Sequence, residues 1–381
     1  MPRYTGWIFF TLLVAAPCAA QTAAVTPTAP DFPRGRISGT MFGDYFYNLV
    51  GDPIHVYDAS GADAGKQSID AAGPITKDLN GTQFRRIYFQ LDNDLTIRIS
   101  TRFRLEVDGK SLTSDSKLGV NVKGAYLQAK SVYPRGDLFV GLIQTPIWEN
   151  SEEFWQYRSI EKTVADFRGL GGSADLGFGL KGFADPNHHF GYSAMMGNGN
   201  GQKALVVSGS VRGEEIDRFK KLYFALPVRF TDLRVEPYAD YEQARTNVAG
   251  NFDRATYKIF AGYEFRKVAV GAEGVERVNH RAGQLSQQPA GFSLFARGVA
   301  TPTLAAFARF DHWQSNRNAK DRIDSQLYIA GIDWQPIKDV HVMPNVEATQ
   351  YIRVGNPAGF PAHHDLQPRI TFYYRFSRPQ S

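Results

Sequence analysis

Basic residues recur at every second position in several segments of this 381-residue chain. In residues 95–107, Arg98, Arg102 and Arg104 alternate with apolar residues. Successive side chains of a β-strand point to opposite faces, so we expect one charged and one apolar face. Basic residues that face a water-filled space attract anions. We expect nine pore-lining residues: Arg86, Arg98, Arg102, Arg104, Lys221, Arg229, Arg309, Arg369 and Arg375.

Acidic residues fall on the same face and leave a second interpretation open. They are Glu106, Glu236, Asp240, Glu242, Glu264 and Asp311. If these carboxylates pair with the basic residues, the lumen carries both signs of charge and has no ion preference. The pattern therefore predicts a charged lumen without deciding between an anion-preferring pore and a mixed one.

A second candidate region is the segment 146–169, PIWENSEEFWQYRSIEKTVADFRG. Its large aromatic residues require a surface to pack against, and the inner wall of a barrel would supply one. We expect a constriction loop that presents charges to the channel, formed by Trp148, Glu152, Glu153, Trp155, Arg158, Lys162 and Arg168. The alternative is a short surface helix that packs on neighbouring loops or at a subunit interface.

The pairs His188-His189 and His363-His364 are the strongest metal candidates, and both are poor ones. Adjacent residues point to opposite faces of a strand, and neither pair has carboxylates at ligand spacing. No short motif indicates a nucleophile with its base. We expect no enzyme activity, metal or cofactor, although a barrel hydrolase whose residues converge from distant strands remains an alternative.

The elements that would position these residues are sixteen alternating segments between Ile37 and Phe376. The connectors alternate between short ones of at most 6 residues and long ones of at least 11. Outer-membrane barrels join their strands by short periplasmic turns and longer external loops. The pattern predicts an all-β, transmembrane, antiparallel up-and-down β-barrel of about 16 strands. A slip of the apolar phase at Gly124 predicts a β-bulge there.

Composition and the first residues set further limits. Residues 1–20 have the pattern of a secretory signal peptide, because the apolar stretch of about ten residues is too short for a membrane anchor, which needs roughly 20. We expect a flexible periplasmic lead over 21–35 and the barrel over 36–381. Cys18, the single cysteine, lies in the signal, so the mature chain has no disulfides. The charge of +5 is too small to indicate nucleic acid as a partner.

Two stretches resemble a known family. FVGLIQTPIWENSEEFWQYRSIEKT (139–163) and ADLGFGLKG (174–182) are similar to the phosphate-selective porin O/P family of sixteen-stranded outer-membrane porins. The resemblance implies a homotrimeric channel for anionic solutes with basic residues along the pore. The chain departs from the pattern at its end, where five residues follow the aromatic Phe376.

The function expected from these observations is an outer-membrane porin. It would lie in the lipid of the bacterial outer membrane and pass small hydrophilic solutes by passive diffusion, and a preference for anions such as phosphate is the finer expectation. A closed barrel that acts as a receptor or adhesin through its external loops is the alternative from another class.

Overall fold

The computed structural model describes residues 31–52, 75–109, 113, 115, 117–199, 201–202, 205–207, 210–212, 220–244, 252–281, 285–357 and 364–379. The predicted signal peptide and residues 21–30 of the predicted lead lie outside this part of the chain. Residues from Pro33 onward form one compact unit.

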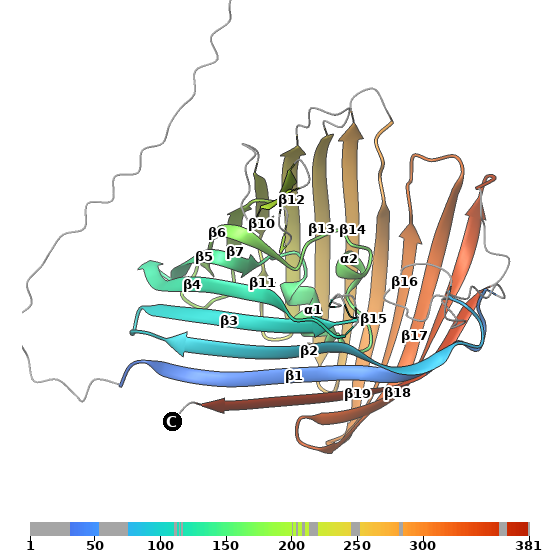
Figure 1. The fold of residues 1–381 in the computed structure, drawn as a ribbon, viewed down its shortest axis with the longest axis horizontal. Helices are drawn as coiled ribbons and strands as arrows, with labels where there is room; N and C mark the ends of the chain where they lie inside the picture. Colours follow the sequence, from blue (N-terminus) through green and yellow to red (C-terminus); the bar gives the residue numbers. More distant parts are fainter. Residues whose placement is uncertain are drawn as a thin grey trace, which may run out of the picture. The chain divides into compact units, whose positions relative to one another are not determined.

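The unit is a sheet of antiparallel strands joined in chain order (Figure 1). The strands of its first half are β1 (Arg34–Tyr47), β2 (Asn80–Asp94), β3 (Ile99–Asp108), β4 (Asn121–Tyr133), β5 (Gly136–Gln144), β6 (Ala174–Phe183), β7 (Gly191–Gly197), β10 (Lys221–Ala225) and β11 (Val228–Arg229). The second half has β12 (Leu233–Ala244), β13 (Phe252–Phe265), β14 (Val268–Arg281), β15 (Ala290–Thr301), β16 (Leu304–Gln314), β17 (Arg322–Ile337), β18 (Val340–Val354) and β19 (Asp365–Pro379). A separate hairpin is formed by β8 (Leu205–Val207) and β9 (Ser210–Arg212).

The sheet closes on itself as a barrel of sixteen strands. β10 and β11 both pair with β12 and form two parts of one strand, interrupted next to Pro227, which has no amide N–H to donate. β1 pairs with β2 on one side and with β19 on the other, so the first and last strands join. The predicted all-β barrel is confirmed, and each of the sixteen predicted segments overlaps one strand.

Side chains alternate between the lumen and the outer face as the sequence pattern predicts. On β10, Lys221 and Tyr223 are buried in the barrel, whereas Leu222 and Phe224 lie on the outside, with Phe224 51% exposed. Exposed apolar side chains of this kind recur around the outer face. An apolar outer band and a polar lumen are the arrangement that a bilayer requires.

Two β-bulges change which residues face the lumen. On β4, Arg104 pairs with Gly124 and Leu105 with Val122, so Lys123 is the extra residue beside the predicted position. On β2, Phe42 pairs with Arg86 and Gly43 with Phe84. The extra residue there is Arg85, and both Arg85 and Arg86 are buried.

Two short helices lie between β5 and β6. They are α1 (Glu149–Trp155) and α2 (Val164–Phe167). Neither of these helices, among the described residues, has the length and apolar character needed to cross a membrane.

The seam where β1 meets its neighbours leaves no room for a side chain at Gly43. A Cβ there would lie 2.1 Å from the carbonyl oxygen of Gln83 and 2.8 Å from the Phe372 ring. We expect Gly43→Ala to lower the free energy of unfolding by about 1–3 kcal/mol through overpacking, measured by urea unfolding in detergent. The control is Gly298→Ala, whose Cβ would meet only the Lys267 carbonyl oxygen, at 4.0 Å. Equal stability of the two variants would contradict the prediction.

Candidate functional site in the barrel lumen

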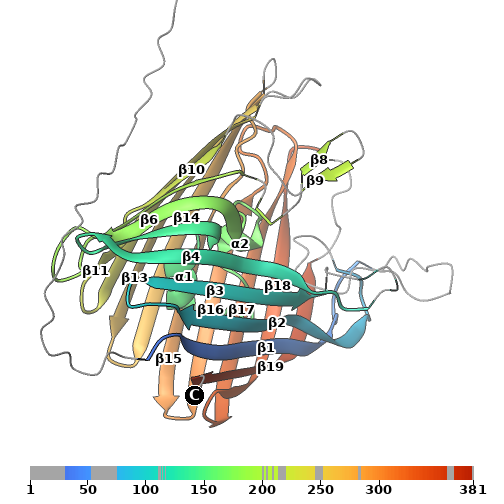
Figure 2. The same ribbon diagram turned by 60° about the vertical axis from the view of Figure 1, so that its left-hand side comes forward.

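The segment 146–169 lies inside the barrel. Figure 1 shows α1 and α2 within the ring of strands, and the turned view in Figure 2 agrees. α1 contacts β13, β14 and β15, and α2 contacts β14 and β15. The segment therefore leaves the wall after β5, crosses to the opposite wall and returns to begin β6.

An apolar patch on the inner wall holds the aromatic side chains of the segment. The ring centroids of Phe154 and Phe260 are 5.6 Å apart, and those of Trp155 and Phe295 are 5.2 Å apart. The buried set comprises Phe154, Trp155, Tyr157 and Ile160 from the segment and Phe260, Ala269, Phe295, Phe307, Leu327, Ile329 and Met343 from the wall. Burial of one large apolar side chain contributes about 1.5–3 kcal/mol, so this cluster is a core within the lumen.

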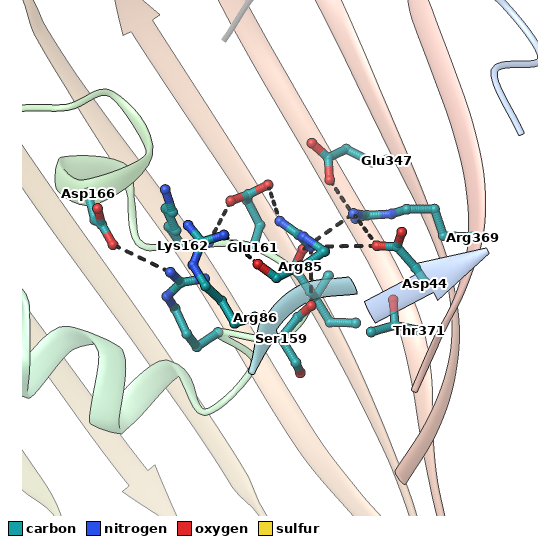
Figure 3. A network of polar contacts seen from close by, with 12 residues as sticks. Asp44, Arg85, Arg86, Ser159, Glu161, Lys162, Asp166, Glu347, Arg369 and Thr371 are labelled. Atoms are coloured by element: carbon teal, nitrogen blue, oxygen red, sulfur yellow. Dashed lines mark hydrogen bonds and ion pairs between the residues drawn. The ribbon is translucent and has the colours of Figure 1, made fainter. Parts of the chain in front are cut away.

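A buried ionic network fastens the segment to the wall (Figure 3). The guanidinium of Arg85 lies 3.1 Å from the Glu161 carboxylate and donates to the backbone carbonyl oxygens of Ser159 and Ile160. Arg369 lies 2.6 Å from Glu347 and 3.7 Å from Asp44, which also faces Arg85 at 3.9 Å. The network, defined by Asp44, Arg85, Glu161, Glu347 and Arg369, joins β1, β2, β18 and β19 to the segment.

Further polar contacts position both helices. The Glu236 carboxylate accepts from Asn150 and lies 3.0 Å from Lys258 Nζ, while Glu273 accepts from the Ala165 N–H at 3.1 Å. Burial raises the pKa of Glu152 to about 7, although the Arg158 guanidinium at 2.7 Å opposes the rise. The segment is thus fixed by charge pairs as well as by apolar packing.

An open space of about 820 Å³ remains between the segment and the wall formed by β1 to β7, with further lining residues on β10 to β12 and β19. We call this space the open lumen. Eight basic side chains line it: Arg86, Arg104, Lys123, Arg135, Arg158, Lys162, Lys181 and Arg229. Six acidic side chains line it as well: Asp137, Glu149, Glu152, Glu153, Asp166 and Glu236. The open lumen is polar and has a modest basic excess.

Of the nine predicted pore-lining residues, Arg86, Arg104 and Arg229 line the open lumen. Five others belong to ion pairs elsewhere on the inner wall or near its rim: Arg102 with Asp92, Lys221 with Asp240, Arg309 with Asp311, Arg369 with Glu347 and Arg375 with Asp339. The Arg375 guanidinium holds the pKa of Asp339, in the turn after β17, below its usual value. Most basic residues are therefore paired, as the mixed-charge alternative expects.

The placement of Arg98 differs from the prediction. Residues 95–98 form the exposed turn between β2 and β3, so Arg98 lies beyond the wall of the barrel. β2 extends to Asp94, and β3 begins only at Ile99. The alternation continues through the turn in the sequence, which is why the pattern placed Arg98 on the strand.

The predicted constriction residues divide into two groups. Trp148, Glu152, Glu153, Arg158 and Lys162 line the open lumen. Trp155 instead packs against the wall and donates its Nε1–H to the Glu161 carbonyl oxygen. Arg168 lies over the Trp313 ring at 5.3 Å and donates to Ser325 Oγ, and burial lowers its pKa to about 10. These two side chains hold the segment in place and do not face the channel.

Arg85 is the most important residue that the sequence analysis missed. Its signal was present, because the apolar phase of 82–92 moves from Phe84 to Ile87 and Phe89. That slip marks a bulge, as it does at Gly124.

Across the described residues, His, Cys, Asp and Glu side chains form no group of three or more that could hold a metal ion.

Comparisons with known proteins find likeness in fold. No family model and no curated protein sequence matches the chain. Among solved structures, the outer membrane channel DcaP of Acinetobacter baumannii superposes with a TM-score of 0.64 at 13% identity, covering 90% of this chain and 97% of that one. An anion-selective porin from Comamonas acidovorans gives 0.63 at 10% identity, with 90% and 100% covered. The trimer form of the outer membrane protein OmpT of Vibrio cholerae gives 0.58 at 10% identity, with 91% and 100% covered.

These likenesses show that the chain has the sixteen-stranded fold of bacterial outer-membrane porins, in agreement with the predicted class. The finer resemblance to the phosphate-selective porin O/P family is not supported by any family model and stays a prediction.

The ionic network predicts that the stability of the protein depends on Glu161, which anchors the segment 146–169 to the wall. The Glu161 and Arg85 side chains are 0% and 1% exposed, and removing one partner of a buried pair costs about 3–5 kcal/mol. We expect Glu161→Ala to lower the free energy of unfolding by that amount in urea titrations. The matched control is Glu153→Ala, because this carboxylate is 55% exposed and pairs with Arg234 near the surface of the lumen, where such a pair contributes about 1 kcal/mol or less. A loss at Glu161 no larger than at Glu153 would refute the role of the network.

Proposed function

We propose that this protein is an outer-membrane porin that forms a water-filled channel for the passive diffusion of small hydrophilic solutes across the bacterial outer membrane. The observation that carries this proposal is the polar open lumen of about 820 Å³ beside a segment fixed to the opposite wall. Sixteen strands are enough to enclose an aqueous channel.

The segment 146–169 serves as the constriction loop in this proposal. Its apolar side packs on the wall of β13 to β18, and its charged side faces β1 to β7. The loop thus narrows the lumen without filling it. Solutes would pass between α1 and the basic residues of β2, β3 and β4.

A preference for anions is the finer part of the proposal. Eight basic side chains face six acidic ones in the open lumen. Among the described residues that line the open lumen, Arg104, Arg135 and Lys162 have no carboxylate within ion-pair distance, unlike Arg86, which lies 3.1 Å from Glu106. Arg104 instead donates to Gln90 at 2.6 Å. Unpaired cations in a narrow lumen raise the local concentration of anionic solutes.

A homotrimer is the assembly we propose, since the Vibrio cholerae OmpT of similar fold is described in a trimer form. Lipid of the outer membrane would surround the trimer, and the open lumen of each subunit would conduct separately.

Conductance in a planar bilayer tests the channel. The purified, refolded full chain should give stable ohmic steps, with a reversal potential in a salt gradient that indicates an anion preference, and phosphate should reduce the current. A folded barrel that gives no steps would overturn the porin proposal and favour a receptor or adhesin.

Two of these three unpaired cations predict a change in selectivity. Replacing Arg104 and Lys162 by Gln leaves six basic and six acidic side chains in the open lumen, with Arg135 still in place, so we expect the reversal potential to show a weaker anion preference. Arg98→Gln is the control, because Arg98 lies in the exposed turn and its replacement should change nothing. An unchanged preference in the double variant would show that other charges set selectivity.

A further inference from the structure

The outer face of the barrel carries a groove on β13, β14 and β15 that the channel function does not use. Its upper part is a hollow of about 510 Å³, bordered by Tyr257, Ile259, Gly274, Glu276 and Phe292. Its lower part is a hollow of about 860 Å³ that continues across the outer face from β12 to β19 and is bordered on β13 to β15 by Ala261, Ala272 and Leu294. Ile259 and Ala261, Gly274 and Ala272, and Phe292 and Leu294 are consecutive outward positions on their strands. The two hollows therefore adjoin.

Small residues create the groove. Ala296, Ala308 and Ala330 are cross-strand neighbours on β15, β16 and β17, and all three border the lower hollow. Beside them stand bulky side chains such as Leu294 and Tyr328, which are exposed. Apart from its polar end and the side chains of Tyr263 and Tyr328, the outward side chains that border the groove are apolar, which suits hydrocarbon.

The polar end of the groove lies at the long-loop end of the strands. Arg317 Nη1 is 3.2 Å from Glu276 Oε1, and the Arg317 side chain is 51% exposed. A guanidinium has five N–H donors, so this pair leaves donors free to face solvent. His312 borders the same hollow. This end can hold an anionic group such as a phosphate.

The length of the groove fits one leaflet of a bilayer. From Glu276 to Val270 it follows six residues of β14, or about 20 Å at roughly 3.4 Å per residue. Strands tilted by about 40° give a depth of about 15 Å, half of a hydrocarbon core of about 30 Å. An amphiphile with its phosphate at Arg317 would thus end its chain near the midplane.

We propose that this groove binds one phosphate-bearing lipid of the outer leaflet, with the phosphate at Arg317 and His312 and an acyl chain along Gly274, Ala272 and Ala296. The proposal depends on the orientation of the barrel, with its long loops outside, and does not depend on conduction. The lumen charges and the groove lie on opposite faces of the wall, so either proposal can fail alone.

Lipid retention by the purified, folded full chain tests this proposal. The protein in detergent is mixed with diphosphoryl lipid A, or with the same lipid after removal of its phosphates, and bound lipid is measured by native mass spectrometry. We expect one tightly retained diphosphoryl lipid per chain and at least tenfold weaker retention of the dephosphorylated form. Equal retention of the two lipids would overturn the phosphate assignment.

Two variants and a control locate the site. Gly274→Leu fills the upper hollow, where a Cβ meets only Ile259 Cγ2 at 3.6 Å, and should weaken retention at least tenfold. Arg317→Gln, in an exposed connector outside the strands, should reduce retention of the diphosphoryl lipid to that of the dephosphorylated lipid. Gly298→Leu, an outward glycine that borders neither hollow, should bind as the unchanged chain does. Unchanged binding in either variant, or an equal loss in the control, would overturn the proposal.

Discussion

The closed ring of backbone hydrogen bonds is the constraint on which the rest of this structure depends. Each amide left unpaired in hydrocarbon costs several kcal/mol, so β1 must pair with both β2 and β19. Closure then divides every strand into an apolar outer face and an inner face that receives the polar residues. The charged lumen, the bulges and the inward segment are all consequences of that division.

Charges gathered inside a barrel must neutralise one another, since ions removed from water are costly unless they are paired. The inner wall follows this rule, with Lys221 beside Asp240 and Arg309 beside Asp311. The inward segment places Glu161 beside Arg85 in the network. The side chains that line the open lumen have a small basic excess. We therefore expect ion preference to depend on the few cations left over after pairing, and not on the total number of Arg and Lys residues.

Much of the fold could be predicted from the sequence, because alternation and loop length are local properties. The strand order, the closure and the bulge beside Gly124 follow from them. The pairing of side chains could not be predicted, since it depends on register between distant strands. Arg98 shows the limit at a turn, where alternation continues although the strand has ended. The aromatic content of 146–169 predicted that the segment needs a surface, but nothing local placed Trp155 against the wall and Glu152 toward the channel.

The ionic network also links the two ends of the chain. Asp44 and Arg85 come from the first two strands, Glu347 and Arg369 from the last two, and Glu161 from the middle of the chain. The Arg369–Asp44 contact crosses the seam between the last strand and the first, and contacts between residues so far apart in sequence form slowly. The aromatic side chains of the segment need only β13 to β18 to pack against. Closure of the seam therefore completes the charged anchor of a segment that apolar packing already holds.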